Sequence, residues 1–240
     1  SLAAFGSSDG GVHWQLLSLV ATRNESLRAM GWEGPGENDL LLLRDGSLLA
    51  VFRVQSCKPY WSATSKDGGR TWASPVALGF GSVRPKLARL RDGRVLLAGG
   101  RPGLFLWLAD PQAMAWTPIH LAATHNQLLA GSAHLAEWLY ADGFTRAGGE
   151  CVAWNSTAAE EAFMQGSSAY SSLIDMGGGE YVVQYDRLAN GWSPPMWKGR
   201  AGVFGSRDYV FAMRFTVPDA SDPPTTTPAP LEAAAHTLTF

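Results

Sequence analysis

A short pattern, two apolar runs joined by a turn dipeptide, occurs three times in the chain. The copies cover residues 40–53, 87–101 and 173–187, and their turns contain Asp-Gly, Asp-Gly and Gly-Gly. Asp-Gly between apolar runs is the strongest short-range signal for a β-hairpin, because both residues accept the backbone angles of a tight turn. The first two copies are about 47 residues apart, a spacing typical of four-stranded propeller blades. The repeat predicts an all-β fold.

A second pattern lies between the hairpins. Residues 7–14 and 65–72 both fit S-x-D-x-G-x-x-W, and Asp110 followed by Trp116 is a degenerate third copy with one extra residue. In such a turn the Asp carboxylate can accept backbone N–H bonds, Gly supplies a positive φ, and Trp packs over the hairpin end. Two full copies with identical spacing, interleaved with the hairpins, indicate a repetitive β architecture.

Composition excludes several classes of protein. The chain has 240 residues, 46% of them hydrophobic, which is enough for a sizeable core in one or two domains. Its formal net charge of -2 argues against general nucleic-acid binding. No apolar run is long enough to span a membrane. The five histidines show no metal-ligand spacing, so we expect neither a metal nor a cofactor. Residue 1 is Ser, so we expect a processed chain or a piece of a longer one.

The cysteines and glycosylation sequons bear on the cellular compartment. Cys57 and Cys151 are the only cysteines, which excludes a disulfide scaffold but leaves open one disulfide or two free thiols. Sequons begin at Asn24 and Asn155. They favour a secreted or lumenal location, although such triplets also arise by chance.

Together, the hairpins and the S-x-D-x-G-x-x-W turns resemble the Asp-box repeats of the sialidase (neuraminidase) superfamily of six-bladed β-propellers. The resemblance covers roughly residues 1–217. Six blades of about 45 residues need about 270 residues plus loops. We therefore expect four to five blades, in a propeller incomplete at its N-terminus; a smaller closed propeller is the alternative. Residues 218–240 are rich in Pro and Thr, which predicts a linker or disordered tail.

Three candidate site residues lie at the ends of the first two hairpins. Glu37 opens the first hairpin and Arg53 closes it, and Arg101 takes the place of Arg53 in the second. In sialidases a Glu at such a position is the base that activates a tyrosine, and arginines grip the substrate carboxylate. The resemblance implies these roles for Glu37 and for the two arginines, whose planar forks bind carboxylates bidentately. The alternative is that all three are ordinary surface charges.

The third hairpin supplies the candidate nucleophile. Residues 167–173 resemble the A/G-Y-S-x-L segment that carries the sialidase nucleophile, which implies this role for Tyr170. A neutral phenol avoids repulsion by the carboxylate of the sugar, but it needs a base beside it. The resemblance also implies that Asp186 orients an arginine. The alternatives are a structural tyrosine in a strand, and an ion pair between Asp186 and Arg187.

One segment of the family is missing from the sequence. We find no F/Y-R-I-P segment, which holds the family's first arginine, and no aspartate acid/base after it; Arg84-Pro85 lacks the preceding aromatic residue and lies in the wrong repeat. The resemblance implies an exo-α-sialidase-like glycosidase that removes a terminal sialic acid or related nonulosonic acid from a glycan. The alternatives are a catalytically impaired propeller that binds carbohydrate or protein, and a purely structural propeller. We expect a monomer.

Overall fold

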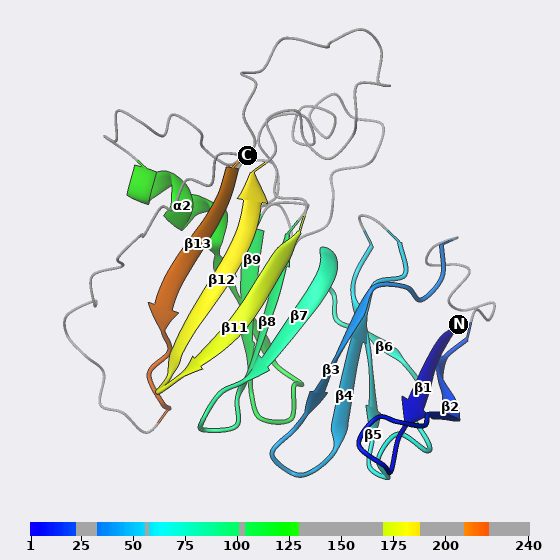
Figure 1. Ribbon diagram of the computed structural model, residues 1–240. Helices are drawn as coiled ribbons and strands as arrows, with labels where there is room; N and C mark the ends of the chain where they lie inside the picture. Colours follow the sequence, from blue (N-terminus) through cyan, green and yellow to red (C-terminus); the bar gives the residue numbers. More distant parts are fainter. Residues whose placement is uncertain (23–32, 56–57, 101–103, 130–169, 188–208, 221–240) are drawn as a thin grey trace, which may run out of the picture.

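The computed structural model describes residues 1–22, 33–55, 58–100, 104–129, 170–187 and 209–220. These ranges form thirteen strands and one helix (Figure 1). The first strands are β1 (Leu2–Gly6), β2 (Gln15–Ala21), β3 (Asn38–Leu42), β4 (Leu48–Phe52), β5 (Trp61–Ser65) and β6 (Val76–Ala77). They are followed by β7 (Val83–Arg89), β8 (Val95–Gly100), β9 (Leu104–Ala109), β10 (Trp116–His120), α2 (Leu121–Leu129), β11 (Ser171–Gly177), β12 (Glu180–Arg187) and β13 (Tyr209–Thr216).

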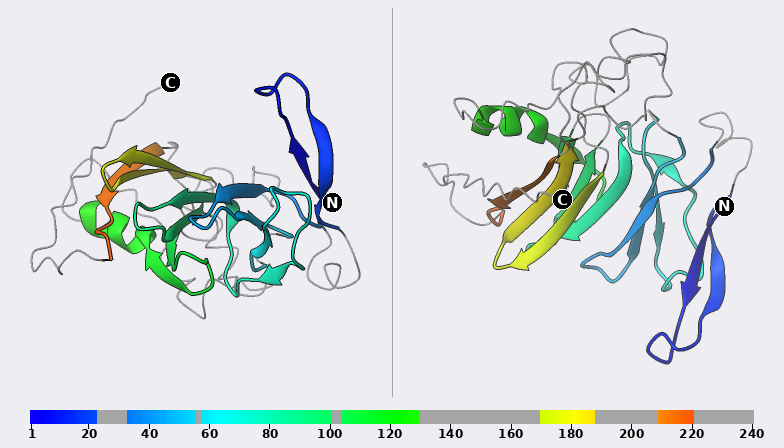
Figure 2. Two further views of the ribbon diagram at one scale, coloured as in Figure 1. Left: turned by 90° about the horizontal axis from the view of Figure 1, so that it is seen from below. Right: turned by 45° about the horizontal axis from the view of Figure 1, so that its top comes forward.

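The strands form four antiparallel sheets that stand side by side in a row (Figures 1 and 2). Two are complete four-stranded meanders, β3-β4-β5-β6 and β7-β8-β9-β10, and they are flanked by the β1-β2 hairpin and by β11-β12-β13. The three predicted hairpins are present as β3-β4, β7-β8 and β11-β12. The first strands of three of the sheets lie side by side, because β7 contacts both β3 and β11. This is how propeller blades are arranged, and the all-β prediction is confirmed.

Both full Asp boxes form the predicted turn. The Asp67 carboxylate accepts the backbone N–H groups of Arg70 at 3.0 Å and of Thr71 at 2.8 Å, and the Thr71 hydroxyl at 2.6 Å. Asp9 accepts the equivalent N–H groups in the first copy. Trp72 closes its turn by donating its indole N–H to the carbonyl of Gly69, which has a φ of 88°.

The degenerate third copy keeps this chemistry. Asp110 accepts the N–H groups of Met114 at 3.1 Å and Ala115 at 2.7 Å, and the Trp116 indole donates to the Ala113 carbonyl. Ala113 has a φ of 57°, so an alanine occupies the left-handed conformation that glycine takes in the other two copies. The aspartate and the tryptophan therefore preserve the turn although the glycine is gone.

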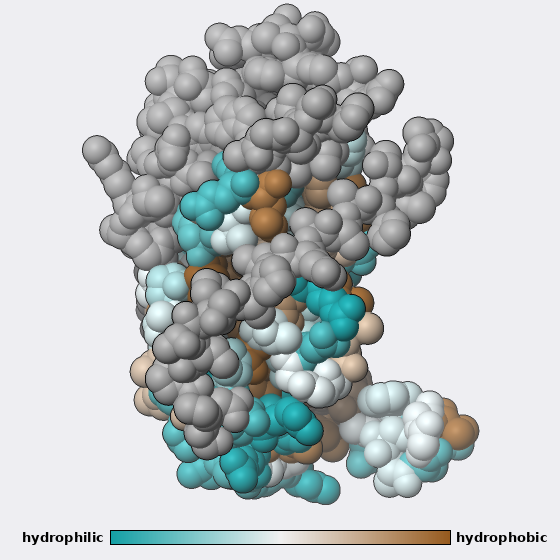
Figure 3. Space-filling model, turned by 90° about the vertical axis from the view of Figure 1, so that its left-hand side faces the viewer, coloured by the Kyte–Doolittle hydropathy of each residue, from teal (hydrophilic) through white to brown (hydrophobic). Residues whose placement is uncertain are grey.

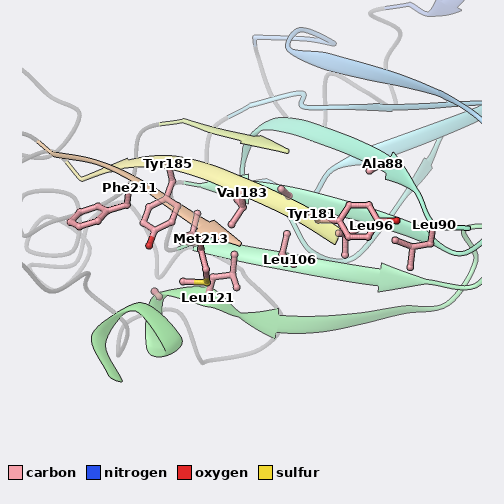
Figure 4. Close-up of a cluster of buried hydrophobic side chains, with 13 residues drawn as sticks. Ala88, Leu90, Leu96, Leu106, Leu121, Tyr181, Val183, Tyr185, Phe211 and Met213 are labelled. Carbon is pink, nitrogen blue, oxygen red and sulfur yellow. The ribbon is translucent and has the colours of Figure 1, made fainter. Parts of the chain in front are cut away.

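The core lies between the sheets, and the central strands are buried on both faces. On β8, Val95 and Leu97 pack toward the β3–β6 sheet, whereas Leu96 and Ala98 pack toward β11–β13. This explains why the sequence of β8 is an unbroken apolar run and does not alternate with polar residues. Figure 4 shows the second of these interfaces, where side chains of β12 and β13 meet those of β8 and β9.

The helix α2 closes one end of that interface. It begins directly after β10, and His120 caps it by accepting the N–H of Ala123 at 3.1 Å. His125 is buried, with its Nδ1 atom 2.8 Å from the hydroxyl of Tyr185 on β12. Burial raises the pKa of the Tyr185 hydroxyl. The helix is therefore fixed to the neighbouring sheet by a polar contact inside the core.

The β1-β2 hairpin projects from the row of sheets (Figure 2). In Figure 3 it stands away from the body of the molecule and carries hydrophobic surface, and its exposed residues include Trp14 and Leu16. Within the described residues, no helix is long and apolar enough to cross a membrane. The described part of the 218–240 segment ends at residue 220, so the predicted tail stays a prediction.

Candidate functional site

The candidate site residues lie along one edge of the sheets, the upper ends of β3, β7 and β11 in Figure 1. Glu37 directly precedes β3 and Arg53 directly follows β4; Tyr170 directly precedes β11, and Asp186 lies near the end of β12. In an antiparallel pair the start of one strand lies beside the end of the next. The structure therefore places equivalent positions of successive sheets at the same end of their strands.

Glu37 and Arg53 form an ion pair. Oε2 of Glu37 lies 3.0 Å from Nε of Arg53, and their backbones are also joined, because the Arg53 N–H donates to the Glu37 carbonyl at 2.9 Å. A second carboxylate, that of Glu33, lies 3.2 Å from the Arg53 guanidinium. The Arg53 side chain is only 14% exposed. Its positive charge is thus held between two carboxylates, one of which, Glu33, the sequence analysis did not single out.

Arg84 joins this pair to Tyr170. Its backbone N–H donates to the same Oε2 atom of Glu37 at 2.9 Å, and its guanidinium lies over the Tyr170 ring, 5.1 Å from the ring centre. That distance is within the range of a cation–π contact. The sequence excludes Arg84-Pro85 as the segment of the family's first arginine and predicts no other role for Arg84. In the structure Arg84 contacts both Glu37 and Tyr170.

Tyr170 is half-buried and tied to the adjacent strand. Its backbone N–H donates to Oδ1 of Asp186 at 3.1 Å, so Asp186 holds the segment that carries the phenol. The side chain of Arg187, the alternative partner of Asp186, lies outside the described residues.

Several sequence expectations also fall on undescribed segments. Arg101, the second predicted arginine, lies outside the described residues. Both cysteines and both sequons also lie outside the described residues.

Buried hydroxyl groups of Tyr60 and Ser82 bind backbone carbonyls near the strand ends that carry the candidate site. Tyr60 is fully buried, burial raises the pKa of its hydroxyl, and that hydroxyl donates to the Val83 carbonyl at 3.0 Å. The Ser82 hydroxyl donates to the carbonyl of Gly100 at the end of β8. Further along β3, Asp39 accepts the N–H of Leu87 at 2.8 Å. Carboxylates of the β3 segment therefore bind the backbone of β7 at two points.

Comparison with known families agrees with the fold and the repeats. Residues 1–183 match the model of the BNR repeat-like domain. The chain belongs to this family. It is a BNR-repeat protein, in accordance with the Asp boxes and hairpins seen in its sequence.

Solved structures with a similar fold are larger proteins. A protein of unknown function from Dyadobacter fermentans is 19% identical over 79% of this chain and 42% of its own, with a TM-score of 0.49. A leech intramolecular trans-sialidase is 19% identical over 79% of this chain and 24% of its own, with a TM-score of 0.44. The NanB sialidase of Streptococcus pneumoniae is 18% identical over 80% of this chain and 24% of its own, with a TM-score of 0.45. The chain thus spans less than half of each. No curated protein matches it.

Proposed function

We propose that this chain carries the substrate site of an exo-α-sialidase-like glycosidase, which removes a terminal sialic acid or related nonulosonic acid. The observation that carries the proposal is the cluster of Glu37, Arg53, Arg84 and Tyr170 at one blade edge of a BNR-repeat chain. A phenol, a carboxylate and guanidiniums are the groups that nucleophilic attack on an acidic sugar requires.

In this proposal Glu37 takes the phenolic proton of Tyr170 while the phenolic oxygen attacks the anomeric carbon. The bond to the leaving-group oxygen breaks, this oxygen takes a proton from solvent, and a covalent glycosyl–tyrosine forms. Water then attacks the same carbon and releases a proton to solvent, while the tyrosine leaves and regains its proton from Glu37, and the configuration is retained. Arg53 and Arg101 are the arginines that the family resemblance assigns to the substrate carboxylate.

A second candidate function is carbohydrate binding without cleavage. Oε2 of Glu37 is already engaged within the protein, because it forms an ion pair with Arg53 and accepts the backbone N–H of Arg84. In addition, the sequence contains no segment that matches the family's aspartate acid/base. Absence of a general acid costs about 10²–10⁴ in rate, so residues 1–240 tested by themselves favour binding over turnover.

The test is hydrolysis of an aryl sialoside by the wild-type chain, Tyr170→Phe and Tyr209→Phe, together with binding of N-acetylneuraminic acid. Tyr209 is a half-buried tyrosine that begins β13, on the far side of β12 from β11, and serves as the matched control. If the chain is a glycosidase, we expect the wild type and Tyr209→Phe to hydrolyse the sialoside, and Tyr170→Phe to show only background hydrolysis. Equal activity of Tyr170→Phe and wild type would reject the nucleophile. Binding without turnover in the wild type would establish the second candidate.

A further inference from the structure

The segment that follows β13 is bound to the turn between β7 and β8. In this turn the Asp92 carboxylate accepts the backbone N–H of Ala220 at 2.9 Å. The Arg94 guanidinium donates to the carbonyl of Pro218. The two side chains of the turn are also joined to each other, because Nε of Arg94 lies 2.6 Å from Oδ2 of Asp92. One turn therefore holds the backbone of residues 218–220, in the region where the sequence predicts a linker or tail.

The equivalent turn between β3 and β4 shows that these contacts are not needed to form the hairpin. There Oδ1 of Asp45 accepts the N–H of Ser47 at 2.9 Å. In the same way, Oδ1 of Asp92 accepts the N–H of Arg94 at 3.0 Å. In the part of the chain that the structure describes, the Asp45 carboxylate forms hydrogen bonds to no residue other than Ser47. The Arg94 side chain and the second oxygen of Asp92 thus serve the following segment, beyond what the turn itself requires.

Both of these side chains are largely buried, which strengthens their interactions. The side chain of Asp92 is 16% exposed and that of Arg94 is 20% exposed. Burial acts to raise the pKa of the Asp92 carboxyl, but the N–H groups of Ala220 and Arg94 outweigh this effect and hold the pKa below its usual value. A hydrogen bond to a charged group contributes more than one between neutral groups. Salt also screens charges less where they are shielded from solvent.

The same turn connects three neighbouring sheets at one end of their strands. On one side, the Arg44 guanidinium of the β3-β4 turn donates to the Asp92 carbonyl at 3.0 Å. On the other side, the N–H of Val217 donates to the carbonyl of Gly179 in the β11-β12 turn at 3.1 Å, and the Val217 side chain packs against the core beneath β12 and β13. Strand β7 runs from the candidate site to this turn, so the connection lies at the opposite end of the strands.

We propose that residues 217–220 form a clasp, which locks the β11-β12-β13 sheet to its neighbours through Asp92 and Arg94. Chain ends stay ordered only where their backbone is bonded or buried, and this segment has both kinds of contact. The sheet lies at one end of the described row, so it is the unit that opens by itself when the clasp is released. The clasp also fixes the point where the Pro/Thr-rich segment leaves the sheets, opposite the candidate site. It is independent of the proposed function, because none of its residues belongs to that site.

Hydrogen–deuterium exchange of the full chain, followed by mass spectrometry, tests the clasp sheet by sheet. Ala220→Pro removes the N–H that Asp92 accepts, and Ala220→Gly, which keeps this N–H, is its matched control. Arg94→Ser gives the β7-β8 turn the residue that the β3-β4 turn has at this position. Arg94→Lys is its control, because an ammonium group keeps a charged donor. Far-UV circular dichroism establishes that each variant is folded.

We expect the amides of β11–β13 to exchange at least ~10-fold faster in Ala220→Pro and Arg94→Ser than in the wild type, about the value of one hydrogen bond to a charged group. The two control variants should stay close to the wild type, and the amides of β3–β6 should exchange at the wild-type rate throughout. Wild-type exchange of β11–β13 in Ala220→Pro and Arg94→Ser would overturn the inference. An equal increase in β3–β6 would overturn it too, because the contacts would then stabilise the whole molecule and lock no single sheet. Neither outcome affects the proposed function, which the sialoside assay tests separately.

Discussion

At the scale of single residues, the candidate site depends on Tyr60, a side chain that does not reach the site itself. Its ring packs edge-on against Phe80 and Trp107, with ring centres 6.4 and 6.1 Å away. Its hydroxyl fixes the Val83 carbonyl, one residue before Arg84. The ring is thus part of the core, and the hydroxyl positions the β-bulge between Val83 and Lys86, where the pairing of β7 with β8 shifts register.

We predict that Tyr60→Phe lowers the free energy of unfolding by about 1–3 kcal/mol, because the Val83 carbonyl loses its buried donor. Urea unfolding followed by tryptophan fluorescence measures this. Tyr181→Phe is the control: its ring is equally buried, but within the described part of the chain its hydroxyl makes no hydrogen bond. Equal losses in the two variants would show that removal of a hydroxyl from a buried ring, and not loss of the bond to Val83, sets the cost.

At the scale of elements, the stability that the Asp boxes contribute to the folded chain depends on pH. The hydroxyl and backbone N–H of Thr71, with the hydroxyl of Ser65, lower the pKa of Asp67 from 3.8 to about 2. The folded chain therefore binds this proton more weakly than the unfolded chain does. The resulting stabilisation is complete above the unfolded pKa and disappears as the pH falls through about 2.

We predict that Asp67→Asn lowers the urea midpoint of unfolding at pH 6, and that the difference from wild type narrows as the pH falls from about 4 to about 2. Protonation makes the wild-type side chain neutral, like that of the variant. Urea titrations at several pH values follow the midpoint. A difference that stays constant over this range would mean that the charge of Asp67 contributes nothing to the turn.

Some features of the fold and of the candidate site could be predicted from the sequence, and others could not. Turns depend on neighbouring residues, so Asp45-Gly46 and the Asp67 box were predictable from short motifs, as was the degenerate Asp110 copy. The bulge at Arg84 was not, because it depends on Tyr60 and on the space beside Gly99, both distant in sequence. Glu37 and Arg53 were found through their place in the repeat. Glu33 lies outside the repeat, and its pairing with Arg53 becomes visible only in the folded chain.

At the scale of the whole molecule, burial is unequal along the row of sheets. Leu97 of β8 lies between two sheets and is 0% exposed. On β11, at one end of the described row, Met176 is 59% exposed and Ile174 is 45% exposed. The same type of apolar side chain therefore has a different energetic role in the middle of the row than at its end.

We predict that Leu97→Ala lowers the free energy of unfolding by about 2–5 kcal/mol, because it opens a cavity between two sheets. Met176→Ala should change it by less than about 0.5 kcal/mol, as expected of an exposed position. Urea unfolding gives both values, and an unchanged m-value would show that each variant unfolds as one unit. A loss in Met176→Ala as large as that in Leu97→Ala would mean that another surface covers β11 in solution, and that the exposed face belongs to an interface.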